Sequence, residues 1–145
     1  MLLIFDCGLI RLAGHAVRLF SYSVTCTMLF NKITPAHAAY FASVLGEKYV
    51  LADEENLDRC ASDETEDLHY LPELVLQPGT TAEVSAVMRY CYEHNLPVTP
   101  RGAGTGLSGG ALPVSGGVVL DMKRFNNILN IDKRNFQVTT EPGVI

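Results

Sequence analysis

The feature that most constrains this chain is a glycine-rich stretch bracketed by Pro100 and Pro113. Five glycines fall between residues 102 and 110 of a 145-residue chain. Glycine reaches positive φ and carries no side chain, so successive backbone amides can converge on one point. Converging amides form a nest for anions, above all for a phosphate or pyrophosphate. Arg101 either adds a charged donor to this nest or supports the loop from beneath. The stretch therefore predicts a phosphate-binding loop.

Two well-known phosphate loops do not fit the stretch. The nucleoside-triphosphate loop needs Gly-Lys-Ser/Thr, and this sequence has none. Residues 104–109 match GxGxxG, but that fingerprint requires a helix to open inside it, with the pyrophosphate at the helix N-terminus. Pro113, Gly116 and Gly117 leave no room for such a helix before the apolar run at 118–120. A Rossmann domain is therefore not expected.

The residues around the loop predict short strands and a helix. Apolar runs at 74–76, 98–99 and 118–120 are typical of short buried strands. Between the first two, Thr80 and Glu83 have the spacing of a capping box, which starts a helix. The apolar face of that helix consists of Val84, Val87, Met88 and Cys91. A right-handed crossover would make the strands at 74–76 and 98–99 parallel neighbours.

Helices are also expected before these strands. Thr34 and Pro35 suit a helix start, and Gly46 suits its end. Asp53 caps a second short helix that reaches about Cys60. The apolar residues between them, 49–52, form a short run.

Two polar segments have their own interpretations. Residues 62–67 are mostly acidic and form either a solvated turn or an acidic patch beside a ligand pocket. Residues 132–135 lie between two strand-like runs, 128–131 and 137–140, which predicts a hairpin. Together these elements indicate an α+β fold: a small parallel sheet with helices, followed by the start of a more antiparallel lobe.

Charge and composition exclude several classes of protein. The net charge is −5, which argues against nucleic acid as a partner. Residues 31–96 are acidic, whereas residues 97–145, which hold the glycine-rich loop, carry a net positive charge. That distribution favours an anionic ligand at the loop. Neither the four cysteines nor the four histidines have metal-ligand spacing, so no metal site is expected.

Residues 1–30 differ from the rest of the chain. Their longest uncharged run is too short for a membrane-spanning helix, and they poorly match a secretory signal. One helical face would hold Leu9, Leu12, Ala13, Ala16 and Phe20, with Arg11, His15 and Arg18 opposite. The segment is interpreted as an amphipathic helix, either packed on the domain or used for targeting. Alternatively, translation starts at Met28 and the segment is spurious.

From Asn31 onward, the sequence resembles a known family of flavoproteins. The pattern PRGxGTGLxGG at residues 100–110 looks like the pyrophosphate loop of FAD-linked oxidases of the vanillyl-alcohol oxidase and p-cresol methylhydroxylase superfamily. Within it, the chain resembles the glycolate oxidase flavoprotein subunit and D-lactate dehydrogenases. Supporting residues are 63–67, 72–75, 77–78, 116–122 and 141–144.

The resemblance implies FAD as cofactor and assigns residues to it. These are Arg101, Gly102, Ala103, Gly104, Thr105, Gly106, Leu107, Ser108, Gly109, Gly110, Gly143 and Val144. By this likeness, residues 101–106 would cradle the pyrophosphate, 107–110 would lead toward the isoalloxazine, and 143–144 would lie near the adenine. Relatives that bind FAD covalently have a histidine where this chain has Thr105, so noncovalent FAD is expected.

The resemblance also implies what a complete relative does. Such enzymes oxidise a small 2-hydroxy acid, glycolate or D-lactate, by hydride transfer to flavin N5, some with an iron–sulfur partner subunit. The residues for that step would lie beyond Ile145, so no catalytic residue is assigned and residues 31–145 are expected to be the truncated N-terminal portion of the FAD-binding domain. A free-standing FAD or nucleotide module and a non-functional remnant remain alternatives. The expected location is the cytoplasm, or the inner face of the membrane as a peripheral protein.

Overall fold

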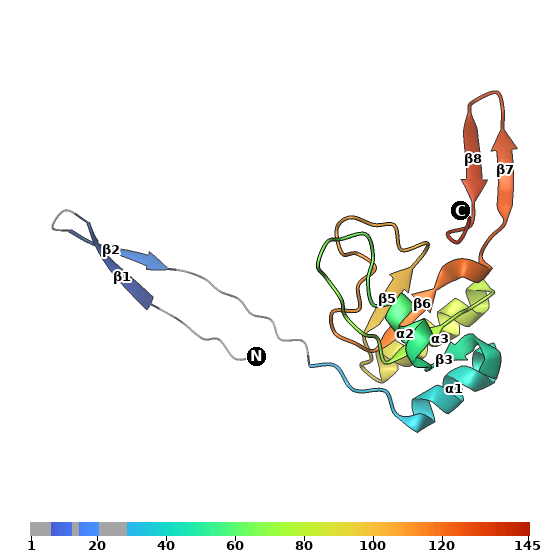
Figure 1. The fold of residues 1–145 in the computed structure, drawn as a ribbon, viewed down its shortest axis with the longest axis horizontal. Coiled ribbons are helices and arrows are strands. Elements are labelled where there is room, and N and C mark those ends of the chain that lie inside the picture. The colour runs from blue at the N-terminus through green and yellow to red at the C-terminus, as the bar shows by residue number, and fades with distance from the viewer. Residues whose placement is uncertain (1–6, 13–14, 21–28) are drawn as a thin grey trace.

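The computed structural model describes residues 7–12, 15–20 and 29–145, and its centre is a four-stranded sheet (Figure 1). The strands lie in the order β3–β4–β6–β5. Their bounds are β3, Val50–Leu51; β4, Leu74–Leu76; β5, Val98–Arg101; and β6, Val118–Asp121. β4, β6 and β5 run parallel, and β3 pairs antiparallel with β4. The parallel sheet expected from the sequence is confirmed.

The order of the parallel strands corrects one expectation. β4 and β5 are not neighbours, because β6 lies between them and pairs with both. Val118 and Val119 of β6 are fully buried, and Leu120 is nearly so. A strand buried in this way suits a central position, where both of its edges are paired. β5 is only partly buried and contains Pro100, which has no N–H to donate and suits an edge strand.

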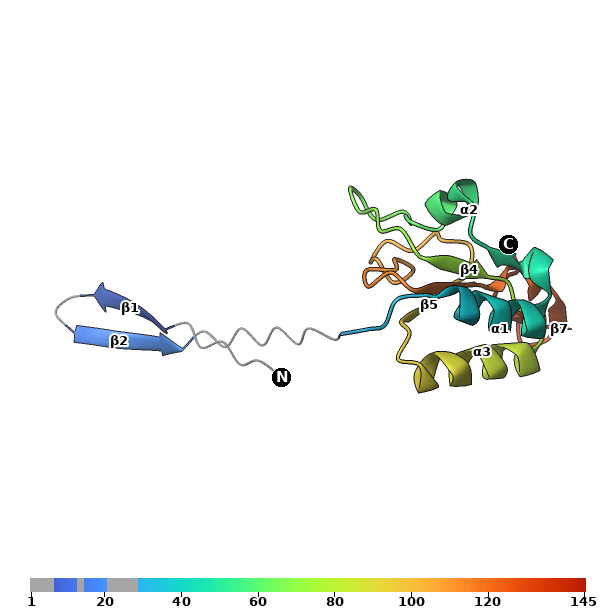
Figure 2. The same cartoon turned by 90° about the horizontal axis from the view of Figure 1, so that it is seen from below.

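Helices cover both faces of the sheet (Figure 2). α1, Pro35–Leu45, and α3, Thr81–Glu93, lie together on one face, and α2, Glu54–Arg59, lies on the other. The alternation of side chains along β4 and β6 divides the core accordingly. On the α1/α3 face the core consists of Phe41, Leu45, Leu74, Leu76, Val87, Cys91, Leu96, Val118 and Leu120. On the α2 face it consists of Cys60, Val75 and Val119.

The two long helices begin where their capping residues predict. Thr34 Oγ1 accepts the backbone N–H of His37 and starts α1. Thr80 Oγ1 accepts the N–H of Glu83 and starts α3. The Glu83 carboxylate does not return to Thr80, as a capping box would have it. It accepts the N–H of Gly79 at 2.7 Å, one residue earlier. Cys91 is buried in the core, as expected.

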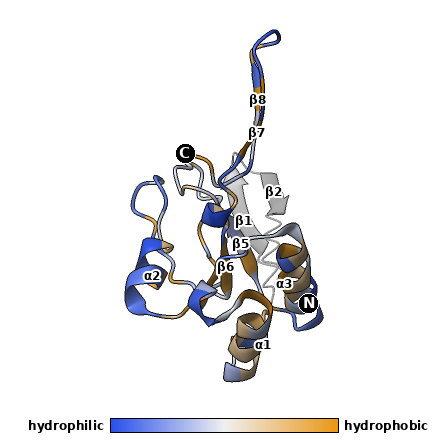
Figure 3. Cartoon of the chain, turned by 90° about the vertical axis from the view of Figure 1, so that its right-hand side faces the viewer, coloured by the Kyte–Doolittle hydropathy of each residue, from blue (hydrophilic) through white to orange (hydrophobic). Residues whose placement is uncertain are grey.

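The end of the chain forms a hairpin that projects from the body (Figures 1 and 3). After the short 3-10 helix η2, Met122–Arg124, β7, Ile128–Asp132, pairs antiparallel with β8, Gln137–Thr140. Asp132 shapes the turn by accepting the N–H groups of Arg134 and Asn135. The hairpin expected from this polar turn is confirmed.

The first thirty residues contain strands where a helix was expected. β1, Cys7–Leu12, pairs antiparallel with β2, His15–Phe20. Gly8 lowers helix propensity, and the β-branched residues Ile10 and Val17 favour extended backbone. The proposed helical face also included Ala13, which lies outside the described residues, as does Met28. In the described ranges, no helix has the length and apolar character needed to cross a membrane.

Candidate cofactor site

Three parallel strands bring polar residues to one edge of the sheet. Arg101 ends β5, Asp121 ends β6, and Gln77 follows β4 directly. In open parallel sheets, ligands bind outside the carboxyl ends of the strands. The glycine-rich loop leaves β5 at this edge, and the chain then runs on to Val118, where β6 begins. Residues 102–117 contain no helix. The predicted loop therefore occupies a position suited to a ligand, and it lacks the helix of a Rossmann site.

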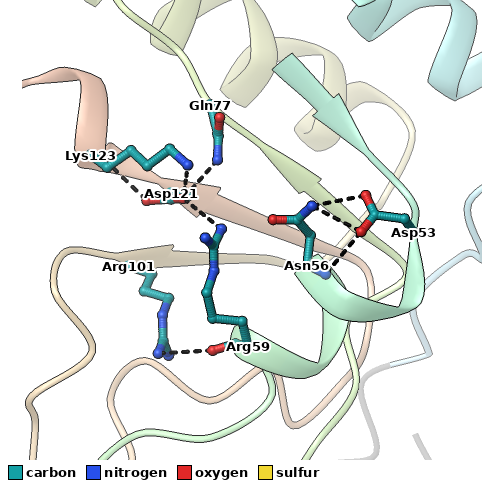
Figure 4. A network of polar contacts seen from close by, with 7 residues as sticks. All are labelled: Asp53, Asn56, Arg59, Gln77, Arg101, Asp121 and Lys123. Carbon is teal, nitrogen blue, oxygen red and sulfur yellow. Dashed lines mark hydrogen bonds and ion pairs between the residues drawn. The ribbon is translucent and has the colours of Figure 1, made fainter. Parts of the chain in front are cut away.

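Arg101 supports the loop from beneath. Its Nη1 donates to the carbonyl of Ser62 at 2.8 Å. Its Nη2 donates to the carbonyl of Arg59 at 3.2 Å, as Figure 4 shows. The same guanidinium lies directly against Gly104. Of the two roles expected for this side chain, the geometry fits the supporting one, and its charge still contributes to the potential at the loop.

Two glycines of the loop are required by its backbone. Gly104 has φ +76° and Gly109 has φ +70°, a region that L-residues rarely adopt. A Cβ on Gly104 would collide with the Arg101 guanidinium. A Cβ on Gly110 would meet nothing within 4 Å, so the loop is open to solvent there. The loop is thus tightly packed at Gly104, against Arg101, and open at Gly110.

Much of the loop is available to a ligand. Its exposed residues are Gly102, Ala103, Thr105, Gly106, Leu107, Ser108 and Gly110. Not every amide is available, however. The N–H of Gly109 is taken by Thr65 Oγ1 at 2.8 Å. The Gly109 amide is therefore not available to an anion, and this residue anchors the loop.

The acidic segment forms the side wall of the loop. Glu64 N donates to the carbonyl of Gly106 at 3.1 Å, and Thr65 Oγ1 holds Gly109. Asp63 Oδ1 accepts the N–H of Thr65 at 2.9 Å. Hydrogen bonds from Thr65 hold the pKa of the Asp63 carboxyl below its usual value. Ser62, Asp63 and Thr65 of the segment therefore pack on the loop, while Glu64, Glu66 and Asp67 remain exposed, as in a solvated turn.

The end of the chain approaches the start of the loop. Gly143 N donates to the carbonyl of Phe125 at 2.8 Å, and a Cβ on Gly143 would collide with the Met122 carbonyl. A Cβ on Gly102 would lie 3.2 Å from the carbonyl of Pro142. Val144 follows, half-buried. The structure thus brings the two predicted groups of site residues, 101–106 and 143–144, to adjoining positions.

A buried carboxylate beneath the loop was not assigned a role from the sequence. Asp121 is 5% exposed and accepts a hydrogen bond from the Gln77 amide at 2.9 Å (Figure 4). Its Oδ2 also lies 3.7 Å from Arg59 Nη2 and 3.9 Å from Lys123 Nζ. These contacts join β4, β6 and α2 at the edge that carries the loop. Gln77 and Asp121 could have been found from the sequence, because each is a polar residue at the carboxyl end of an apolar strand run.

Removing the Asp121 carboxylate is expected to destabilise the domain. Asp121→Ala leaves the buried Gln77 amide without its acceptor, which costs about 2–3 kcal/mol of unfolding free energy. Asp121→Asn keeps an acceptor oxygen and should lose less. Urea denaturation measures both. The matched control is Asp58→Ala, which removes the exposed pair with His69 and should change stability by less than about 0.5 kcal/mol. Equal midpoints for Asp121→Ala and Asp58→Ala would contradict the role given to Asp121.

Comparison with known proteins identifies the family of this domain. The family model described as "FAD binding domain" matches residues 72–145, about half of the chain. The chain belongs to this family of FAD-binding domains. The matched region contains α3, the glycine-rich loop and the hairpin, whereas the acidic segment at 62–67 lies before it.

Individual relatives also match the chain over much of its length. D-lactate dehydrogenase of Anaerostipes hadrus is 37% identical over 116 residues, which cover 80% of this chain and 24% of that protein. Glycolate oxidase subunit GlcD of Bacillus subtilis is 42% identical over 95 residues, 64% of this chain and 20% of that protein. The chain spans about a fifth to a quarter of the length of these relatives.

The fold also matches a solved structure. The crystal structure of p-cresol methylhydroxylase with substrate bound has a TM-score of 0.67 and 28% identity, over 80% of this chain and 24% of that one. FAD is therefore the cofactor of this domain, as the resemblance implied. The loop suits it, because Gly102, Ala103, Thr105 and Gly106 are exposed and the Arg101 guanidinium lies against Gly104, which fits a pyrophosphate. In the part of the chain that the structure describes, no group of three or more acidic, histidine or cysteine residues could hold a metal ion.

Proposed function

We propose that this chain forms the cofactor-binding part of an FAD-dependent oxidoreductase that oxidises a small 2-hydroxy acid, glycolate or D-lactate. The observation that carries the proposal is the glycine-rich loop at the carboxyl edge of the parallel sheet, in a member of the FAD-binding family. The names of the relatives supply the substrate class. When bound, FAD would supply the flavin that accepts a hydride from C2 of the substrate.

In this proposal, the loop binds the cofactor through its backbone. The amides of Gly102, Ala103, Gly104, Thr105 and Gly106 hold the pyrophosphate. Leu107, Ser108 and Gly110 continue along the cofactor, and Gly143 and Val144 lie on the adenine side. Gly109 serves as an anchor because its amide is already bonded within the protein. FAD is held noncovalently, since Thr105 offers no imidazole for a covalent link.

The 145-residue chain supplies binding and orientation, and substrate oxidation is assigned to a longer protein of the relatives' kind. An iron–sulfur subunit is a suitable electron acceptor for such an enzyme, because a reduced flavin must be reoxidised. We place the protein in the cytoplasm or at the inner face of the membrane. A free-standing FAD or nucleotide module is the second candidate, and it is favoured by the buried core on both faces of the four-stranded sheet.

Competition among ligands tests the pyrophosphate assignment. We expect the chain to bind FAD, and ADP to compete with it, because both carry the pyrophosphate. Riboflavin lacks the pyrophosphate and should bind at least about tenfold more weakly, since the loop recognises that group. Flavin fluorescence titration measures all three. If riboflavin binds as well as FAD, or ADP fails to compete, the loop does not hold a pyrophosphate.

A further inference from the structure

The acidic segment before the family match makes a set of contacts that the FAD-binding assignment does not use. Three hydrogen bonds join residues 62–65 to the loop region: Arg101 Nη1 to Ser62 O, Glu64 N to Gly106 O, and Gly109 N to Thr65 Oγ1. These residues are 39 to 44 positions apart in sequence. A glycine-rich loop has many accessible conformations, so fixing it before ligand binding lowers the entropy lost on binding.

Asp63 orders Thr65, the residue whose side chain accepts the Gly109 amide. Its Oδ1 accepts the N–H of Thr65 in a tight turn of the segment. Its Oδ2 is buried and has no hydrogen-bond partner among the residues that the structure describes. A Cβ on Gly106 would lie 3.6 Å from this Oδ2, so the oxygen lies directly under the loop. The carboxylate therefore lies against the loop and orders Thr65 from that position.

We propose that Asp63 and Thr65 are positioning residues for the cofactor: Asp63 fixes Thr65, and Thr65 Oγ1 fixes Gly109, so that the amides of residues 102–106 are held ready for the FAD pyrophosphate. This inference rests on the proposed function of the loop. It adds residues that lie outside the matched family region, 72–145. Neither side chain needs to touch FAD, because each acts on the loop backbone.

Substitutions at Thr65 separate positioning from general stability. Thr65→Val keeps the shape of the side chain but removes the acceptor of the Gly109 amide. We expect the Kd for FAD to rise about fivefold to tenfold, the value of one lost hydrogen bond. Thr65→Ser restores the hydroxyl and should bind FAD within about twofold of the parent. The matched control is Thr139→Val, at an exposed position on β8, which should leave the Kd unchanged.

A measurement without ligand tests the contact between Thr65 and Gly109 by itself. Hydrogen exchange of the Gly109 amide should be at least about tenfold faster in Thr65→Val than in the parent or Thr65→Ser, because its hydrogen bond is lost. Thermal melting records whether each variant is folded. A general loss of stability would lower the melting temperature but leave the Kd of the folded protein unchanged, and that result would overturn the positioning role.

A double variant tests whether the two residues act together. Asp63→Ala removes the acceptor of the Thr65 amide, so it should also weaken FAD binding. Combined with Thr65→Val, it should weaken binding by no more than about twofold beyond Thr65→Val alone, because residues acting through one contact are not additive. Fully additive losses would overturn the proposed chain of contacts. If the parent itself binds no FAD, the proposed function fails, while exchange of the Gly109 amide still decides whether Thr65 holds Gly109.

Discussion

Gly104→Val is expected to abolish measurable FAD binding, with the Kd raised about hundredfold or more. Gly104 has φ +76°, and a β-branched residue there is a strong outlier. Its side chain would also collide with the Arg101 guanidinium, whose bonds to Ser62 and Arg59 hold the loop from beneath. To relieve the collision, either Arg101 must give up its bonds to Ser62 and Arg59, or the loop must move its amides. Either change disturbs the amide positions that an anion requires. Fluorescence titration with FAD measures the loss.

The control for Gly104→Val must share its backbone strain and lie outside the loop. Gly46 has φ +89°, and the nearest atom to a Cβ there is Tyr49 Cδ2 at 3.9 Å. Gly46→Val should therefore lose about 1–2 kcal/mol of unfolding free energy from strain, with FAD affinity unchanged. Gly104→Val binding FAD as the parent does would show that this loop is not the pyrophosphate site.

Gly117→Ala is expected to be the most destabilising single substitution, with a loss of about 4 kcal/mol or more of unfolding free energy. A Cβ there would lie 2.5 Å from the carbonyl oxygen of Pro97 and 2.7 Å from its Cδ. Val118 N donates to that same carbonyl at 2.9 Å, so the obstructing oxygen belongs to the backbone at the start of β6. This oxygen cannot move without loss of that hydrogen bond, and the Pro97 ring is fixed to the same backbone. Overpacking and positive-φ strain then add together.

The neighbouring glycine provides a matched comparison. Gly116 has φ +70°, close to the +68° of Gly117, so both substitutions carry similar backbone strain. The nearest atom to a Cβ on Gly116 is Glu73 Oε1 at 3.1 Å, on a side chain that can shift. Gly116→Ala should therefore lose only about 1–2 kcal/mol. Urea denaturation of both variants measures the difference, and equal losses would show that contact with Pro97 is not the cause.

Local elements of this domain were predictable because their signals are local. Thr34 and Thr80 start helices through hydrogen bonds that span three residues. Asp132 makes its turn through bonds to residues two and three positions ahead. The apolar runs at 74–76 and 118–120 became the buried strands β4 and β6. The hydrogen bonds of the two helix caps and of the turn need nothing from the rest of the chain.

The first strands of the chain show the limit of pattern reading. Apolar residues at β1 and β2 can be placed on a helical face, yet they also suit extended backbone, and β1 pairs with β2 in register. Short apolar segments carry both patterns at once, and pairing with another segment decides between them. For the same reason, the sequence alone did not predict that β6 would separate β4 from β5.

The sequence by itself determined the chemistry of this protein: a glycine-rich loop after a strand, typical of an anion site, and a family pattern that specifies FAD. Tertiary structure decided how that loop is held. Arg101 turns inward to two backbone carbonyls, and Thr65 takes the amide of Gly109 from a segment more than forty residues away. The physical reason is that hydrogen bonds between distant segments depend on which strands pair and which faces are buried. Only the folded sheet brings these residues to one edge.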